Sequence, residues 1–223
     1  MRPASSEQRT SRTEVRRHPE RGAYDRCVIE QILDEGLFCH VGFVHEGQPF
    51  VIPTIHARAG DTLFIHGSPA SRMLRELADG VDVCVTVTLL DALVLARSVY
   101  NHSMNYRSVV VVGRARPLSD RGQKLAALEA IVEHLVPGRW GDARQPTEKE
   151  LAGTLVLELP LAEASAKTRS GPPKDFEADL DLPVWAGVIP LSLRSGLPAA
   201  DPGLAPGIPL PPYLAKPDLR LDG

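Results

Sequence analysis

The sequence predicts a mainly β protein, a small mixed barrel whose ends are covered by helices. About seven or eight short β-rich runs are separated by turn signals, and three or four helical patterns lie among them without regular alternation. No glycine pattern of the Rossmann or P-loop kind follows any of these runs. The doubly wound and P-loop classes are therefore excluded, and a barrel remains.

The composition is that of one globular domain. Of 223 residues, 43% are hydrophobic and 24% are charged, and no apolar run reaches the length of a membrane helix. A net charge of -3 and 5% aromatic residues do not favour a nucleic-acid surface. The three cysteines are far apart, so neither a zinc site nor a disulfide framework is indicated. We expect a cytoplasmic protein with no metal site and no membrane or nucleic-acid partner.

The two ends differ from the middle in composition. Seven arginines face four acids in the first 26 residues, without the apolar stretch of a secretory signal. We expect residues 1–23 to form a basic arm that covers a partner or is solvated or disordered. Residues 24–191 form the expected domain. Seven of the 20 prolines lie in the final 33 residues, which predicts an extended or disordered tail over residues 192–223.

The first half of the domain begins with a helix. Apolar residues recur at helical spacing over 24–35, and Gly36 follows where a helix end is expected. Residues 37–44 and 49–58 predict a hairpin around Glu46 and Gly47, and a strand over 62–66 follows a second turn.

The second half begins with a short helix. Ser68 is expected as its N-cap and Pro69 as its first residue, with Gly80 at its end. A longer helix is expected after Ser119, and Thr147 with Glu150 has the spacing of a capping box. The remaining β-rich runs predict strands over 81–90, 93–100, 106–116, 154–161 and 184–191.

Three polar segments could form one site. His66 to Arg72 leads from a strand into a helix start, where backbone N–H groups, a hydroxyl and a guanidinium favour a phosphate. An ordinary helix cap with a surface arginine would have the same sequence. Residues 98–108 are mostly polar and too long for a tight turn, whereas residues 165–173 form a basic, hydroxyl-rich loop ahead of Trp185. A solvated loop is the alternative for both.

Together these segments carry a resemblance. The runs I-P-T, F-I-H-G-S-x-x-S-R, L-A-R-S, H-S-M-N-Y-R-S-V and V-W-A-G begin at Ile52, Phe64, Leu95, His102 and Val184. In combination they resemble the pyridoxamine 5'-phosphate oxidase-like, FMN-binding split-barrel family, in the branch of flavin-nucleotide-binding proteins related to nitroimidazole reductases. The resemblance spans about residues 24–191. It implies a split β-barrel of six to eight antiparallel strands with Greek-key connections, and a homodimer with the flavin at its interface.

The resemblance also implies roles for particular residues. The strand at 51–54 offers backbone groups to the flavin ring, Ser71 and Arg72 grip the phosphate, and His66 matches a histidine close to the flavin in nitroimidazole reductases. Arg107 and Ser108 match the step that opens a flavin-contacting strand. The expected cofactor contacts are Val51, Ile52, Pro53, Thr54, His66, Gly67, Ser68, Ser71, Arg72, Ser103, Arg107, Ser108, Lys167 and Trp185.

The departures from the family pattern concern the substrate. Met73 stands where the oxidases have a basic residue, and the proline-rich tail lacks their arginine-histidine segment. Vitamin B6 is therefore not the expected substrate. The seven histidines include no pair at metal-binding spacing, and His40 and His56 lie inside expected strands, which favours a structural role.

We expect an FMN-dependent oxidoreductase that takes hydride from a reduced nicotinamide, NAD(P)H, or a similar donor and reduces a small electrophile or dioxygen. His66, Tyr106 and Arg107 are the expected catalytic residues, with roles in positioning and charge stabilisation. Two alternatives stay open. One is a non-catalytic flavin or haem carrier or sensor, and the other is a reductase that uses the deazaflavin F420.

Overall fold

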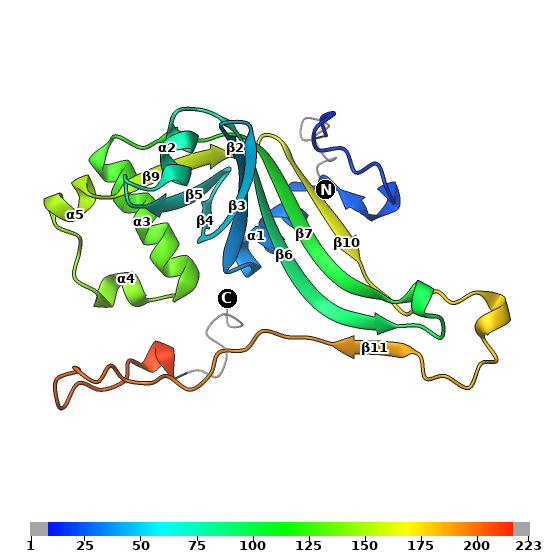
Figure 1. Ribbon diagram of the computed structural model, residues 1–223. Helices are drawn as coiled ribbons and strands as arrows, with labels where there is room; N and C mark the ends of the chain where they lie inside the picture. Colours follow the sequence, from blue (N-terminus) through cyan, green and yellow to red (C-terminus); the bar gives the residue numbers. More distant parts are fainter. Residues whose placement is uncertain (1–8, 216–223) are drawn as a thin grey trace.

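Two antiparallel sheets face each other and form the barrel (Figure 1). The computed structural model describes residues 9–215. The larger sheet has the order β1-β10-β7-β6-β2-β3 with β11 beside β6, and the smaller has the order β4-β5-β9-β8. The strands are β1 Gly22–Ala23, β2 Phe38–His45, β3 Gln48–Ile55, β4 Ala57–Ala59, β5 Thr62–Gly67, β6 Asp82–Leu95, β7 Ser103–Arg114, β8 Arg116–Pro117, β9 Leu155–Pro160, β10 Ala164–Arg169 and β11 Gly187–Pro190. The predicted mainly β barrel is confirmed.

The helices cover the barrel. α1 buries Ile29, Ile32 and Leu33, whose spacing places them on one helix face, against strands of both sheets. α3 packs on the outer side of the smaller sheet over β4, β5 and β9. The helices are α1 Arg26–Glu35, α2 Arg72–Ala78, α3 Arg121–Leu135, α4 Arg139–Asp142 and α5 Glu148–Ala152, with short 3-10 turns η1 Pro19–Arg21, η2 Val99–Asn101, η3 Glu177–Asp179 and η4 Pro212–Leu214.

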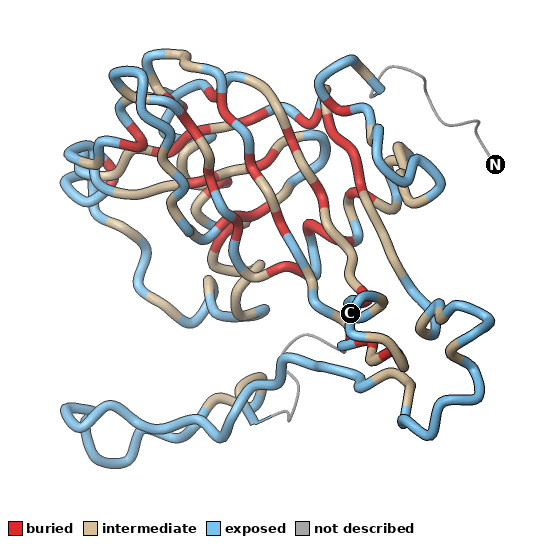
Figure 2. Tube along the Cα trace, turned by 45° about the vertical axis from the view of Figure 1, so that its right-hand side comes forward, coloured by how far each residue is buried: buried red, intermediate tan, exposed pale blue. Residues whose placement is uncertain are grey.

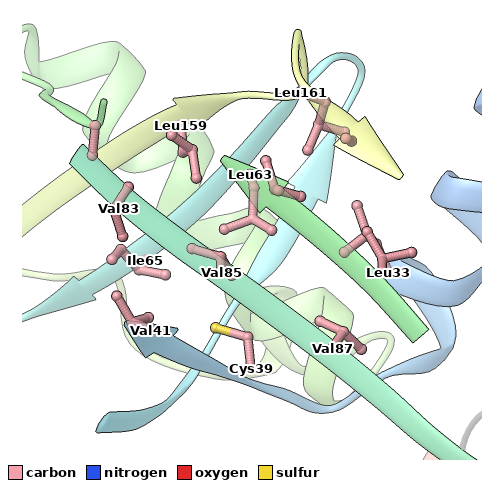
Figure 3. Packing of buried hydrophobic residues seen from close by; sticks show 14 of the residues in the cluster. Leu33, Cys39, Val41, Leu63, Ile65, Val83, Val85, Val87, Leu159 and Leu161 are labelled. Atoms are coloured by element: carbon pink, nitrogen blue, oxygen red, sulfur yellow. The ribbon is translucent and has the colours of Figure 1, made fainter. Parts of the chain in front are cut away.

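The core lies between the two sheets. Val41, Val83 and Val85 of the larger sheet point toward Leu63 and Leu159 of the smaller one (Figure 3). Buried and exposed residues alternate along these strands, so each strand has one face in the core (Figure 2). The outer face of the larger sheet is consequently left without cover from the described part of the chain over much of its area.

The first hairpin forms as predicted. β2 and β3 are joined at Glu46 and Gly47, whose φ angles of 50° and 77° give the two left-handed residues of a tight hairpin turn. The expected strand over 49–58 is nevertheless two strands. His56 is fully buried between them, and its Nε2 lies 3.0 Å from the carbonyl oxygen of Leu33. The chain leaves the larger sheet at this residue and enters the smaller one.

The expected strands over 81–90 and 93–100 are wrong as separate elements, because β6 runs through both. The register with β7 shifts between Leu90 and Ala92, which makes Asp91 the extra residue of a β-bulge. The polar Asp91 therefore does not end the strand. The β6–β7 ribbon extends beyond the barrel, and β11 pairs with β6 along this extension (Figure 1).

Two helix starts differ from the prediction. The side chain of Ser71, rather than Ser68, caps α2, and Asp120, rather than Ser119, caps α3. Each true cap accepts a hydrogen bond from the backbone N–H three residues ahead, at Leu74 and Gln123. Ser68 instead caps a tight turn before α2 by accepting from Ala70 N at 3.2 Å. The capping box of Thr147 and Glu150 is confirmed.

Two expected loops are largely strand. Residues 164–169 form β10, although the sequence there is basic and rich in hydroxyls, and β7 begins at Ser103 inside the polar segment 98–108. Alternation explains this, because Ala164 and Ala166 face the core while Lys167 lies on the outer side. The loop that follows β10 begins only at Ser170.

The N-terminal arm lies against the barrel, and the C-terminal tail runs away from it. Residues 9–17 of the arm lie beside β10, and residues 191–215 run beyond β11 without regular structure except η4 (Figure 1). Tyr213 anchors that tail, since its hydroxyl donates to Asp142 at 2.8 Å. The described part of the tail has no other helix or strand. The expected domain boundaries remain predictions, and the arm and tail predictions for residues 1–8 and 216–223 fall outside the described residues.

Candidate functional site on the outer face of the larger sheet

The strand register aligns five side chains across the outer face of the larger sheet. Pro53, His40, Thr86, Val110 and Ser165 are direct neighbours on β3, β2, β6, β7 and β10. Directly paired residues point to the same side of a sheet. This row therefore runs from the edge strand β3 to the strand beside the N-terminal arm.

The β2–β3 end of this face is apolar. Phe38 and Val44 on β2 and Val51 and Ile55 on β3 are exposed there, and Val51 keeps 66% of its surface accessible. β3 is also the last strand of the sheet, so the backbone groups of residues 51–54 on its free edge are available to a ligand or partner, as the sequence predicts for this strand.

The β7–β10 end of the face is polar. Ser108 lies between Thr88 and Lys167 in register, and its hydroxyl donates to the carbonyl oxygen of Lys167 at 3.2 Å. Tyr106 is two residues earlier on β7 and shares the face. The structure thus brings together Tyr106, Ser108 and Lys167 among the expected site residues.

Arg107 points to the other face of β7. Its guanidinium forms ion pairs with Asp91 at 2.8 Å and with Glu35 at the end of α1. The hydrogen bonds that Arg107 donates to Glu35, followed by those to Asp91, raise the pKa of Arg107 above its ordinary value. Two carboxylates offset its charge, and Arg107 holds α1 against the bulge of β6.

The predicted phosphate corner at the start of α2 uses its hydroxyls internally. Ser68 and Ser71 both accept hydrogen bonds from backbone N–H groups of the following residues, although each hydroxyl keeps a proton to donate. Arg72 is exposed, and its guanidinium carbon lies 4.1 Å from the ring centre of Phe50 on β3. Phe50 pairs with the buried Phe43 and packs against the core, so this contact places the Arg72 charge on the core side of β3, opposite to the outer face.

His66 lies on a different face from the other site residues. It pairs with Val156, and Val156 packs with Leu118 and Ala127 under α3, so His66 shares the α3 side of the smaller sheet. Burial lowers the pKa of His66 below its ordinary value, and its Nδ1 is buried without a hydrogen-bond partner in residues 9–215. Its place thus separates it from Tyr106 and Arg107, with which it was expected to act.

The remaining expected contacts are spread along the chain. Gly67 ends β5 beside Leu74, and Ser103 opens β7 opposite Val94 on the extended ribbon. Trp185 precedes β11 and is 66% exposed, with its ring over Gly187, where a Cβ would approach it to 2.8 Å. One chain therefore supplies two groups of site residues, one around β3 and α2 and one around β7, β10 and β11.

Sequence reasoning missed two features of this face. His40 was assigned a structural role, but it is exposed in the middle of the outer face beside Phe38. Residues 12–17 of the arm lie against Ser108 and Lys167. The adjacent Arg16 and Arg17 were a visible signal, but no sequence pattern says where a loop packs. Within the described chain, no three His, Cys, Asp or Glu residues are grouped as for a metal, and no helix is long and apolar enough to cross a membrane.

Solved structures similar to this chain include a flavocytochrome, Anf3 from Azotobacter vinelandii. It is 43% identical, with a TM-score of 0.87, and the match covers 92% of this chain and 95% of that one. An FAD and haem binding protein from Mycobacterium smegmatis is 38% identical, with a TM-score of 0.83 over 87% of this chain and 95% of its own. A 5-nitroimidazole antibiotic resistance protein homologue from Bacteroides thetaiotaomicron is 25% identical, with a TM-score of 0.55 over 66% and 85% of the two chains.

A search of the curated proteins found no match. Residues 25–168, however, match the family described as pyridoxamine 5'-phosphate oxidase, and this segment contains both sheets except for β1, β11 and the last residue of β10. The two similar structures above 30% identity extend the match over nearly the whole chain. The chain belongs to the pyridoxamine 5'-phosphate oxidase family.

Proposed function

We propose that this protein is a flavin-dependent oxidoreductase that also carries haem and works as a symmetric dimer. The observation that carries the proposal is the 43% identity over 92% of the chain to a flavocytochrome. The FAD and haem binding protein at 38% identity supports the same pair of cofactors. The flavin supplies hydride and electron transfer when it is bound, and a reduced nicotinamide, NAD(P)H, is the proposed donor.

The proposed flavin is FAD in place of the FMN expected from the sequence. The word FAD in the description of the Mycobacterium smegmatis protein supports the larger nucleotide. The outer face offers an apolar end for a flat ring and a polar end for charged groups, which suits any flavin. FMN and F420 are therefore outcomes that the experiment must separate from FAD.

The proposed partner is a second copy of the chain. Exposed Phe38, Val44, Val51 and Ile55 form a contiguous apolar surface on paired strands, and such a surface is typical of a protein interface. A twofold axis would bring the same patch together twice. Each flavin could then contact Arg72 and β3 of one copy and Ser108, Lys167 and Trp185 of the other, which accounts for the two separated groups.

Haem needs an imidazole whose ring nitrogen is free. Most of the described histidines have a hydrogen-bond or ion-pair partner: His18, His45, His56, His102 and His134. His66 is buried on the α3 side of the smaller sheet, away from the outer face, whereas His40 makes only a ring contact with Phe38. His40 is exposed on the face that is apolar at this end, which suits a porphyrin. His40 is the residue that would hold the haem iron. The chain itself would then hold the iron, exclude water from the ring and position both cofactors.

The visible spectrum of the purified protein tests the proposal. Flavin absorption with FAD in the released fraction, together with a Soret band, is the expected result. A His40→Ala variant should lose the Soret band and keep the flavin. Release of FMN alone would support the cofactor expected from the sequence, and a colourless protein that takes up only F420 would contradict the proposal.

A further inference from the structure

The ribbon of β6 and β7 carries a histidine beyond the barrel (Figure 1). His102 follows the turn η2, which joins the two strands, and its side chain is exposed. Its Nδ1 lies 3.0 Å from the carbonyl oxygen of Ser98. A carbonyl oxygen only accepts hydrogen bonds, so Nδ1 carries the proton and Nε2 of the neutral ring keeps its lone pair. Nε2 has no hydrogen-bond or ion-pair partner within residues 9–215.

This is the arrangement of a histidine that binds a metal. Such imidazoles usually donate the second ring N–H to a carbonyl or carboxylate, which fixes the orientation of the ring. Among the described histidines, His56 and His134 use Nε2 for their own carbonyl contacts. His18 and His45 face carboxylates through Nδ1, but His18 belongs to the arm and His45 contacts α2. His102 is therefore the oriented imidazole of the ribbon.

The outer face of the ribbon beside His102 is apolar. Ile189, Leu93 and Met104 are direct neighbours on β11, β6 and β7, and they are 42%, 40% and 44% exposed. Met104 is two residues after His102 along extended backbone, so the two side chains share one side of the chain. Trp185, just before β11, is also exposed. A flat apolar ring fits a sheet face of this kind, which is costly to leave in water.

His40 and His102 of one chain cannot reach the same iron. His40 pairs with Thr86 of β6, whereas Ser103, the residue after His102, pairs with Val94. The stretch of β6 from Thr86 to Val94 spans roughly 25 Å at about 3.3 Å per residue. Two nitrogens on one iron lie only about 4 Å apart, because a metal–imidazole bond is about 2 Å long. Both histidines nevertheless belong to one continuous outer face.

A second copy removes this obstacle. Tyr106 and Ser108 of β7 join the outer face of the ribbon to that of the barrel, which carries the apolar surface proposed as the dimer interface. A twofold axis that places the ribbon of one copy over the outer face of the other does so twice, because the same surfaces meet in both directions. Each copy would then offer its ribbon to the His40 of the other.

We propose that His102 is the second haem ligand and that it binds the haem held by the partner subunit's His40. The inference rests on the proposed function, and it names the residue through which each copy completes the haem site of the other. Met104 and Trp185 would cover the porphyrin and exclude water. Two imidazole ligands make haem iron low-spin, whereas one leaves an open position and high-spin iron.

The first test is the spin state of His102→Ala, read from visible and electron paramagnetic resonance spectra. The variant should stay a dimer and keep its flavin and a Soret band, but its low-spin signals should be lost. Added imidazole should restore them. His18→Ala, which removes an exposed histidine of the arm, should have the spectrum of the wild type. His102→Met should raise the reduction potential of the haem, since a thioether replaces an imidazole.

A mixed dimer tests whether the two ligands come from different copies. One chain carries His40→Ala and the other His102→Ala, and the pair is co-expressed with two tags and purified through both. Ligands from two copies leave one of the two sites intact, so low-spin haem should return at about half the wild-type content. Neither variant alone should show it. Two ligands from one copy would leave no intact site.

Four results would overturn the inference. They are high-spin haem in the wild type, an unchanged low-spin spectrum in His102→Ala, an unchanged potential in His102→Met, and a mixed dimer without low-spin haem. A wild-type protein with no Soret band after reconstitution with haemin is a different result. It would reject the haem part of the proposed function, and the inference with it.

Discussion

Single side chains on this barrel are placed by the two-residue alternation of the strands. Tyr106 and Ser108 lie on the outer face, and Arg107 between them points to the side where Asp91 and Glu35 hold it. Its double pairing suits a structural role. Arg17 and Lys167 lie on or beside the outer face, and within residues 9–215 neither has an ion pair with a carboxylate.

Replacing Arg72 by alanine should weaken flavin binding for FAD and FMN alike. One charge-assisted phosphate contact contributes about 1.5–3 kcal/mol, which corresponds to roughly tenfold or more in affinity. Fluorescence titration of the apoprotein with FAD and with FMN gives the two dissociation constants. Arg75→Ala, three residues later on the same helix, serves as the control. Equal dissociation constants for wild type and Arg72→Ala would remove Arg72 from the site.

Folding stability should fall as the pH is lowered through about 6.5, the ordinary pKa of histidine. Burial lowers the pKa of His66 in the folded state, so the unfolded chain takes up a proton first. The contribution of neutral, buried His66 to the free energy of unfolding is present above about pH 6.5. It is lost as the pH falls further, until His66 is protonated in the folded protein as well. Urea unfolding at pH 7.5 and 5.5 should show a smaller loss for His66→Gln than for wild type. An equal loss in both proteins would contradict this.

Elements of the barrel meet at close contacts that fix their angles. Gly36 ends α1 where a Cβ would lie 2.3 Å from Cγ1 of the buried Val87 on β6. Its φ of -72° is open to any residue, so space rather than backbone conformation requires glycine there. The side chain of His134 also reaches Gly36, with Nε2 at 2.8 Å from its carbonyl oxygen. α1, β6 and α3 are therefore joined at one point.

Gly36→Ala should destabilise the fold by about 1–3 kcal/mol, because an added methyl group must displace a packed core residue. The midpoint and slope of urea unfolding give this difference. Gly141→Ala in α4, where nothing lies within 4 Å of the new Cβ, should leave stability unchanged or slightly raised. A neutral Gly36→Ala would mean that α1 can shift away from β6.

At the scale of the whole molecule, the barrel has one sheet face in contact with helices and one open face. The smaller sheet is covered by α3, but the larger sheet exposes apolar residues beside a polar row that ends under the arm. An apolar surface of this kind is costly in water. A second copy on this face would cover it and would complete the cofactor sites.

Val51→Glu should convert the dimer to a monomer, since it places two like charges at the twofold interface. Light scattering after gel filtration should give twice 24.2 kDa for wild type and 24.2 kDa for the variant. Leu197→Glu, in the tail and 98% exposed, should remain a dimer. A wild-type monomer would contradict the proposed interface, and a dimeric Val51→Glu would place the interface elsewhere.

Local sequence signals determined much of the fold. The β2–β3 hairpin follows from its turn residues and β-rich runs, the capping box of Thr147 from its spacing, and the barrel class from the number of strands without helix alternation. These features depend on neighbours in the sequence. The family was also recognisable from short motifs, and the family match over residues 25–168 confirms it.

Only the tertiary structure decided what each polar segment does. Residues 164–169 form a strand because their backbone pairs with β7 and their alanines pack in the core. Pairing with β7 likewise joins the two strands expected over 81–90 and 93–100 into one, with a bulge at Asp91. Likewise His66 faces α3, His40 faces outward, and the arm packs over Ser165. A sequence shows which groups are present, but strand pairing brings distant residues together, and pairing depends on contacts between segments far apart in the chain.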